Sequence, residues 1–342
     1  MKEDTKRSNS TILWLLIMIV LLLIIAFGIT LLTKNNETSV GTNNVEISVT
    51  DESETESVPS EAESVVTEPS EESETEHFDG LNIYDSEIYS DTALLMSIDG
   101  EELYSKNGEE QMYPASLTKI MTAIIALENI NYLDESVVVP GDIFEYIESE
   151  GAATAGFSAY ESVSYRDLLY GALLSSGAEC CLTLADYLGG SEEMFVQMMN
   201  EKAAEIGMEN THFTNVIGLH NYEHYSTAED IAKLLIYALD NDEFRKIFTS
   251  QSYYTETDYQ PYGVTLSSTM FSELDSEYFV GGAFLGGKTG YTSEAGYCLA
   301  SLSRVNGKEY ILITAGAEGS NYMGSLRIAD AVNIYETLAE NT

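Results

Sequence analysis

The sequence predicts a mixed α/β fold for residues 78–342: one antiparallel sheet formed by both ends of this region and flanked by helices. Two hairpin patterns indicate the sheet. Their strand-like runs are residues 93–98, 102–105, 297–305 and 309–314. Asp99-Gly100 separates the first pair of runs and Asn306-Gly307 the second, and both dipeptides favour tight hairpin turns.

Helical patterns lie between the two hairpins and after the second. Apolar residues recur there with a period of about 3.6 residues. The periodic segments are residues 120–127, 168–173 and 231–238, and a closing helix is predicted over 328–338. Strands at both ends with helices between them place the two ends of this region in one sheet, packed against helices.

An apolar run of 21 residues, residues 12–32, dominates the N-terminus and is interrupted only by one glycine and one threonine. As a helix it would be about 31 Å long, enough to cross the hydrocarbon core of a bilayer. A cleaved signal peptide and a buried core helix are the alternatives. A signal peptide usually has a shorter apolar region and a small-residue cleavage site. A buried core helix is a poor match to the length and position of this run.

Basic residues surround this run unevenly: three precede it, and Lys34 alone follows it before a long acidic stretch. The positive-inside rule therefore predicts a cytoplasmic segment at 1–11, a transmembrane anchor at 12–33 and an extracellular remainder. The localisation expected is the cell membrane, in a single pass. The absence of a lipoprotein signal fits a bacterium with one membrane and a thick wall, that is, a Gram-positive one.

Residues 34–77 are predicted to be a disordered linker. After Lys34 this stretch contains 13 acidic residues, no Lys or Arg, and mostly Ser, Thr, Glu and Val. Such a composition buries too little apolar surface to offset chain entropy, and its like charges extend it. We interpret it as a spacer between the anchor and the domain at 78–342.

The charge of the chain excludes one class of partner. With 57 acidic and 15 basic residues, the formal net charge is −42. A nucleic-acid partner is therefore not expected, because such proteins bring cations to phosphates. The four histidines lack zinc-ligand spacing, so neither a metal site nor a cofactor is predicted.

Ser116 and Lys119 form the first motif with chemical potential. Ser116 follows Pro114, and the helical period begins at Ile120, so Ser116 is expected at a helix N-terminus. Side chains at i and i+3 share a helix face. A neutral lysine there can take the proton of a nucleophilic serine, and burial or a second cation lowers its pKa enough. Alone, the motif is weak evidence for a catalytic site, since a helix N-cap followed by a solvated lysine explains the same spacing equally well.

Two further triplets carry polar groups in the same region. Lys288-Thr289-Gly290 follows two pairs of glycines, which permit the close approach of a ligand backbone. Its lysine and hydroxyl could hold a carboxylate and lower the pKa of Lys119, although in isolation the triplet is typical of a turn. Ser176-Gly177-Ala178 follows a helical run, and in isolation it is typical of a turn between helices.

The order and spacing of the three motifs resemble those of penicillin-binding proteins and serine β-lactamases. The second motif lies about 60 residues after the first, and the third about 110 after the second. The flanking residues are similar to the serine-type D-alanyl-D-alanine carboxypeptidases, the low-molecular-mass penicillin-binding proteins. The similar segments are residues 113–123, 167–171, 224–227 and 287–298. The resemblance covers roughly 80–340 and implies the transpeptidase/β-lactamase-like fold.

The resemblance implies a role for each motif residue. Ser116 would be the acylated nucleophile, Lys119 its general base and Ser176 a proton relay to the leaving amine. The backbone N–H groups of Ser116 and Tyr291 would form the oxyanion hole. The residues implied in substrate binding are Lys288, Thr289, Gly290 and Arg327. Arg327 is matched by a loose Arg-x-x-Asp-Ala pattern, and a solvated helix charge is an equal interpretation.

The implied function is removal of the terminal D-alanine from peptidoglycan stem peptides in cell-wall and cell-shape metabolism, with β-lactam antibiotics as inhibitors. The second motif departs from the family, because Ala178 stands where the family usually has Asn. That Asn normally contacts the lysine base and the substrate; Ser175 or Glu179 could replace it. Two alternatives therefore stay open: a D,D-endopeptidase and a catalytically impaired peptidoglycan-binding protein. A β-lactamase is less favoured, because no Glu-x-x-x-Asn motif follows Ser176 before Lys288.

The cysteines and one histidine allow smaller predictions. Cys180 and Cys181 are adjacent and cannot easily pair with each other, whereas either could bridge to Cys298. The favoured interpretation is that all three are small buried hydrophobic residues. His224 is predicted to position a helix N-cap.

Overall fold

The computed structural model describes residues 81, 83–319 and 325–342. The predicted anchor at 12–33 and linker at 34–77 lie outside the described residues. Within the part of the chain that is described, no helix is long and apolar enough to span a membrane.

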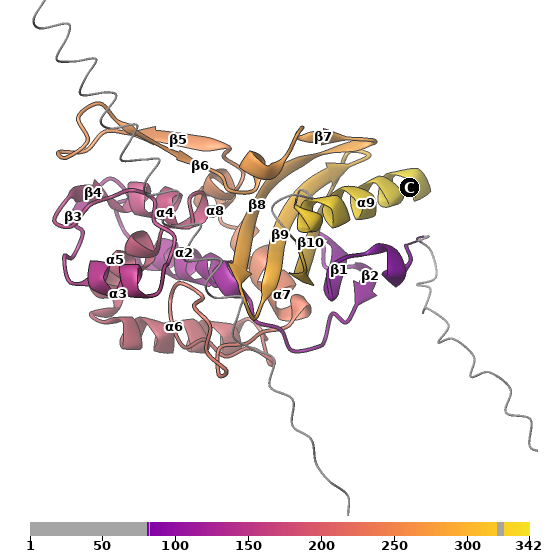
Figure 1. Ribbon diagram of the computed structural model, residues 1–342, viewed down its shortest axis with the longest axis horizontal. Coiled ribbons are helices and arrows are strands. Elements are labelled where there is room, and N and C mark those ends of the chain that lie inside the picture. The colour runs from indigo at the N-terminus through magenta and orange to yellow at the C-terminus, as the bar shows by residue number, and fades with distance from the viewer. Residues whose placement is uncertain (1–80, 82, 320–324) are drawn as a thin grey trace, which may run out of the picture. The chain divides into compact units, whose positions relative to one another are not determined.

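A six-stranded antiparallel sheet forms the centre of the domain, in the order β2-β1-β10-β9-β8-β7. Its strands are β1 (Thr92–Ser97), β2 (Glu102–Lys106), β7 (Tyr278–Phe279), β8 (Gly282–Thr292), β9 (Gly296–Val305) and β10 (Lys308–Ala317). Because β1 pairs with β10, the sheet joins the two ends of the domain, which confirms the predicted architecture. Figure 1 shows the indigo N-terminal strands beside the orange C-terminal ones.

Both predicted hairpins are confirmed. Gly100 turns the chain between β1 and β2 with φ of 88°. Between β9 and β10, Val305 pairs with Lys308, and Asn306 and Gly307 form the two-residue turn with φ of 48° and 85°. Positive φ at both positions is the requirement of the turn type that Asn-Gly favours.

The helices follow the predicted periods at all four segments. They are α2 (Thr118–Asn129), α3 (Ile143–Ser149), α4 (Tyr165–Leu173), α5 (Ala178–Gly189), α6 (Glu192–Glu205), α7 (Ala228–Leu239), α8 (Asp242–Phe248) and α9 (Leu326–Asn341). Two small sheets pair β3 (Ser136–Val138) with β4 (Ser162–Ser164) and β5 (Ser252–Thr255) with β6 (Val264–Ser267). The sequence patterns did not predict α3, α6, α8 or these two sheets.

Alternating side chains of the central sheet enter two separate cores. Leu94 of β1 and Ile313 of β10 face the larger core, which α2 and the helices from α4 to α8 complete. Leu95 and Leu312 face the other core, which α9 covers together with the segment before β1. The sheet is thus a middle layer with helices on both faces, as Figure 1 shows for α7 and α9.

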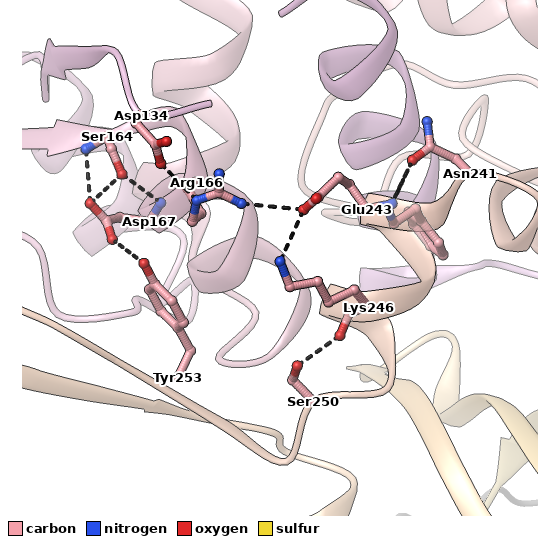
Figure 2. A network of polar contacts seen from close by, with 10 residues as sticks. Asp134, Ser164, Arg166, Asp167, Asn241, Glu243, Lys246, Ser250 and Tyr253 are labelled. Carbon is pink, nitrogen blue, oxygen red and sulfur yellow. Dashed lines mark hydrogen bonds and ion pairs between the residues drawn. The ribbon is translucent and has the colours of Figure 1, made fainter. Parts of the chain in front are cut away.

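A polar network ties α4 to α8 and to β5 (Figure 2). Asp167 completes a capping box with Ser164 at the start of α4 and also accepts from the Tyr253 hydroxyl at 3.1 Å. Arg166 bridges Asp134 and Glu243. The ring of Tyr253 stacks on Tyr170 with centroids 3.8 Å apart. These contacts fix the start and the middle of α4 relative to the segment that carries β5 and β6, and the second motif follows from the other end of the same helix.

Replacement of Asp167 by Ala should lower the free energy of unfolding by about 2 kcal/mol, because it removes the carboxylate half of the capping box and leaves the Tyr253 hydroxyl without its acceptor. Urea unfolding followed by circular dichroism measures this. Asp134→Ala is the control from the same network: its carboxylate is exposed, so stability should stay nearly unchanged. Equal effects of the two substitutions would contradict the argument.

Candidate active site

Ser116 lies in a 3₁₀ turn, Ala115–Leu117, that runs directly into α2. This agrees with the helix N-terminus predicted for it. The amine of Lys119, one turn later, lies 3.0 Å from the Ser116 hydroxyl and donates to the carbonyl of Ile217 at 2.6 Å. The predicted i, i+3 pairing therefore forms, and a backbone carbonyl holds the lysine from its other side.

Lys119 is 3% exposed, although it carries a basic group. Burial lowers the pKa of the Lys119 amine, against smaller opposing effects from Cys181 and Glu179 on α5. A lowered pKa increases the fraction of neutral amine at neutral pH. Lys119 can then accept a proton from the serine hydroxyl beside it.

Ser176 lies between α4 and α5 with φ of 60°, in the left-handed region that non-glycine residues rarely adopt. Its hydroxyl accepts a hydrogen bond from the amine of Lys288 at 2.9 Å. Lys288 comes from the middle of β8, is fully buried, and also donates to the Thr289 carbonyl at 2.7 Å. Burial, followed by the charge of Lys119, holds the pKa of Lys288 well below its usual value.

The third motif lies inside β8 and not in a turn, because β8 continues through it to Thr292. The Thr289 hydroxyl pairs with the hydroxyl of Thr269 at 2.6 Å. Gly290 packs against the turn of the first motif: a Cβ there would lie 3.1 Å from the backbone nitrogen of Ser116. Glycine at this position brings β8 and Tyr291 beside the nucleophile.

A cleft of about 600 Å³ opens over these groups. It is lined by predicted site residues from all three motifs, namely Ser116, Lys119, Ser176, Thr289, Gly290, Tyr291 and Arg327. Lys288 is fully buried and contacts Ser176. It therefore reaches the cleft through the Ser176 hydroxyl rather than by its own exposed surface.

Arg327 is 5% exposed, so the interpretation as a solvated helix charge is wrong. Its guanidinium forms a two-point ion pair with Glu273 and donates to the carbonyls of Gly290 at 2.7 Å and Cys298 at 3.2 Å. Arg327 lines the cleft, but these contacts already use its donors to brace β8 and β9. Sequence reasoning missed Glu273, which lies 54 residues away.

Ser175 and Glu179, suggested as substitutes for the missing Asn, form their hydrogen bonds with other partners. Glu179 is fully buried, and one of its oxygens accepts from the backbone nitrogens of Ala155, Gly156 and Phe157 at 2.7–3.2 Å. Burial raises the pKa of the Glu179 carboxyl. The Ser175 hydroxyl reaches a backbone carbonyl of β6 at 3.5 Å. Both therefore support neighbouring segments, and the described contact on the far side of Lys119 is the Ile217 carbonyl.

His224 joins α2 to the segment that carries Ile217. Its Nδ1 accepts from the backbone N–H of Thr214 at 3.0 Å, so its Nε2 carries the proton and lies 2.8 Å from the Thr118 hydroxyl. Thr227, from the same block, is the N-cap of α7 and accepts from the backbone N–H of Asp230. The described hydrogen bonds of His224 go to Thr118, Thr214 and Asn215, and its role in positioning that cap stays a prediction. Burial lowers the pKa of His224 from 6.5 to about 4.

The three cysteines are free and buried. This agrees with the favoured interpretation and not with a bridge to Cys298. Burial raises the pKa of Cys181 and of Cys298 to about 12. Neither thiol is therefore a thiolate nucleophile at neutral pH.

The arrangement as a whole fits acyl transfer through a covalent intermediate. A hydroxyl lies beside a buried amine of lowered pKa, and a second hydroxyl lies beside a second buried amine. One pair can generate a nucleophile, and the other can pass a proton to a leaving group.

Comparison with known proteins gives consistent matches. The family model described as D-alanyl-D-alanine carboxypeptidase matches residues 79–319. The D-alanyl-D-alanine carboxypeptidase DacF of Bacillus subtilis is 32% identical over 66% of this chain, which spans 57% of that relative. A D-alanyl-D-alanine endopeptidase of Escherichia coli is 29% identical over 68% of this chain and 73% of its own length. The crystal structure of the Streptomyces K15 DD-transpeptidase superposes with a TM-score of 0.62 at 27% identity, covering 74% of this chain and 97% of that one.

Gly290→Ala should slow the reaction of Ser116 with a fluorescent penicillin by roughly tenfold, because the added Cβ pushes the Ser116 backbone by a few tenths of an ångström. Gly319→Ala is the control, since its Cβ would meet only ordinary contacts with the ring of Tyr297, the nearest at 3.4 Å. Labelling time courses of both variants give the rates. Unchanged labelling of Gly290→Ala would show that this close approach is not needed.

His224 should make the fold sensitive to acid. The unfolded chain takes up this proton near pH 6.5 and the folded chain only near pH 4, so stability falls as the pH falls through that window. A pKa lowered from 6.5 to about 4 corresponds to a loss of roughly 3 kcal/mol when the pH falls below 4. Urea unfolding at pH 7 and pH 4 should therefore show a smaller loss for His224→Asn than for the unchanged protein. An equal loss would exclude His224 as the cause.

Proposed function

The chain belongs to the D-alanyl-D-alanine carboxypeptidase family, and from this premise we propose that it is a serine-type peptidase of peptidoglycan. Its reaction is the removal of the terminal D-alanine from stem peptides through an acyl-enzyme. The observation that carries the proposal is the 3.0 Å contact between the Ser116 hydroxyl and the buried amine of Lys119, whose pKa burial lowers. That pairing is what a nucleophilic serine requires.

Acylation begins with neutral Lys119. Its amine takes the hydroxyl proton of Ser116, and the Ser116 oxygen attacks the carbonyl carbon of the penultimate D-alanine. The resulting oxyanion is stabilised by the backbone N–H groups of Ser116 and Tyr291. As the peptide C–N bond breaks, the proton now on Lys119 passes through the Ser176 hydroxyl, which lies 2.9 Å from the Lys288 amine, to the leaving amine, and Lys119 is neutral again. Lys119 then takes a proton from water, which attacks the acyl carbon. The bond from this carbon to the Ser116 oxygen breaks, and the Ser116 oxygen takes the proton back from Lys119.

The substrate carboxylate is proposed to bind at Thr289, within the third motif. The Thr289 hydroxyl lines the cleft and pairs with Thr269, which fixes its direction. Lys288, behind the cleft wall, and Arg327, in the cleft lining, contribute positive charge, and Gly290 lets the substrate chain lie close to β8. β-Lactam antibiotics are proposed to acylate Ser116 in the same way, with opening of the lactam C–N bond.

We further propose where the enzyme acts. The apolar run at 12–33 and the basic residues before it support a single membrane span with residues 1–11 in the cytoplasm. The acidic segment at 34–77 would then hold the domain at 78–342 away from the membrane on the outside, where peptidoglycan lies. Reaction of membrane-impermeant amine reagents with whole cells tests this orientation.

The catalytic proposal is tested with the full chain and its Ser116→Ala variant. Both are incubated with a fluorescent penicillin and with a diacetylated Lys-D-Ala-D-Ala peptide, and label and free D-alanine are followed. We expect labelling and D-alanine release from the unchanged chain, and a loss of both by at least about 10³-fold in the variant. A variant that retains release would contradict the assignment of Ser116.

Two other results would redirect the proposal. Labelling without D-alanine release, together with cleavage of cross-linked muropeptides, would favour the endopeptidase, the activity named for one of the relatives. Binding of stem peptides without labelling would favour an impaired binding protein, which the alanine at position 178 motivates.

A further inference from the structure

The position of the Lys119 amine depends on a single lasting contact. Among the described residues its hydrogen-bond partners are the Ser116 hydroxyl and the Ile217 carbonyl. In the proposed reaction the contact with Ser116 changes when that hydroxyl loses its proton and becomes acylated. The carbonyl of Ile217, at 2.6 Å, stays through every step and can only accept. It therefore directs one N–H away from Ser116 and leaves the lone pair facing the hydroxyl.

Asn215 builds the turn that presents this carbonyl. Its Oδ1 accepts from the backbone nitrogens of Ile217 at 3.2 Å, Gly218 at 2.7 Å and Leu219 at 3.0 Å. Its Nδ2 donates to the Leu219 carbonyl at 3.0 Å. The side chain is 8% exposed, so water replaces few of these bonds if they are lost. One amide group thus closes the whole segment 215–219.

The same segment is fitted to the catalytic helix at two more points. The Thr122 hydroxyl, one turn after Lys119, donates to the Val216 carbonyl at 2.7 Å. Gly218 has φ of 81° and lies against the turn of the nucleophile: a Cβ there would come within 1.9 Å of the Ala115 carbonyl oxygen. The segment closed by Asn215 therefore contacts the chain on both sides of Ser116.

We propose that Asn215 is a positioning residue for the general base, because it fixes the Ile217 carbonyl that orients the Lys119 amine toward Ser116. This inference rests on the proposed function. The methyl side chain of Ala178 in the second motif cannot hydrogen-bond the Lys119 amine. We assign that contact to segment 215–219 instead, through the Ile217 carbonyl. Asn215 acts through Lys119 and does not touch substrate, so its loss should slow chemistry more than it weakens binding.

The test compares three variants of the full chain. Asn215→Ala removes the amide, and Asn215→Asp keeps an acceptor oxygen for the three N–H groups. Asn200→Ala is the matched control, since Asn200 holds the backbone of Phe213 through both its amide atoms at 2.9 Å without contacting segment 215–219. Benzylpenicillin acylation is resolved into its dissociation constant and its first-order rate, and peptide hydrolysis into KM and kcat.

For Asn215→Ala we expect the acylation rate and kcat to fall by about 10- to 100-fold, with KM and the dissociation constant changed by less than about threefold. Asn215→Asp should recover most of this loss. Asn200→Ala should keep the acylation rate and kcat of the unchanged chain, even if its melting temperature drops as much as that of Asn215→Ala. If Asn215→Ala does not fold, Asn215→Ser, whose hydroxyl is too short to reach three N–H groups, carries the same expectation.

The failures of the inference and of the proposed function are distinguishable. An unchanged chain that neither labels nor releases D-alanine would refute the function before any variant is compared. An active chain whose Asn215 variants keep their acylation rate would refute the positioning role. So would an effect confined to KM, or an equal loss of rate in Asn200→Ala.

Discussion

Two lysine amines buried in one site are the constraint on which the rest of this structure depends. Removing one ammonium group from water is costly, and two close together repel each other as well. The pKa values of Lys119 and Lys288 are both lowered, first by burial, and the charge of Lys119 lowers that of Lys288 further. The pair therefore exchanges protons more easily than exposed lysines do. Burial converts two ordinary cations into groups suited to acid–base catalysis.

The fold meets this constraint by giving each amine a hydroxyl and a backbone carbonyl. Lys119 has Ser116 and the Ile217 carbonyl, and Lys288 has Ser176 and the Thr289 carbonyl. These partners come from the turn before α2, from β8 and from the loops between helices, and the larger core holds the neighbouring elements together. The antiparallel sheet brings β8 beside the turn before α2, although Lys119 and Lys288 lie far apart in sequence. The distances between these groups are thus a consequence of how the turn before α2 packs against β8.

The sequence predicted the parts of this arrangement that depend on residue type. Asn306-Gly307 forces a hairpin, and Ser116 with Lys119 shares a helix face by spacing alone. The Ile217 carbonyl was not predictable, because every residue carries a backbone carbonyl and only the fold selects one. The pairing of Arg327 with Glu273 was missed for a similar reason: nothing in the sequence links two charges so far apart. The strand around Lys288 resembled a turn because its glycines serve close packing and not chain reversal.

Among the described residues, two of the five non-glycine residues with positive φ lie beside the proposed reacting groups. Ala115 and Ser176 have φ of 46° and 60°, a conformation that costs a non-glycine residue about 1–3 kcal/mol. One precedes the nucleophile and the other carries the proposed proton relay. A side chain on Gly218 would collide with the Ala115 carbonyl, and one on Gly290 would press against Ala115 and Ser116. The two glycines therefore allow neighbouring segments to enclose the strained turn, and this enclosure stabilises the backbone that places the Ser116 hydroxyl beside Lys119.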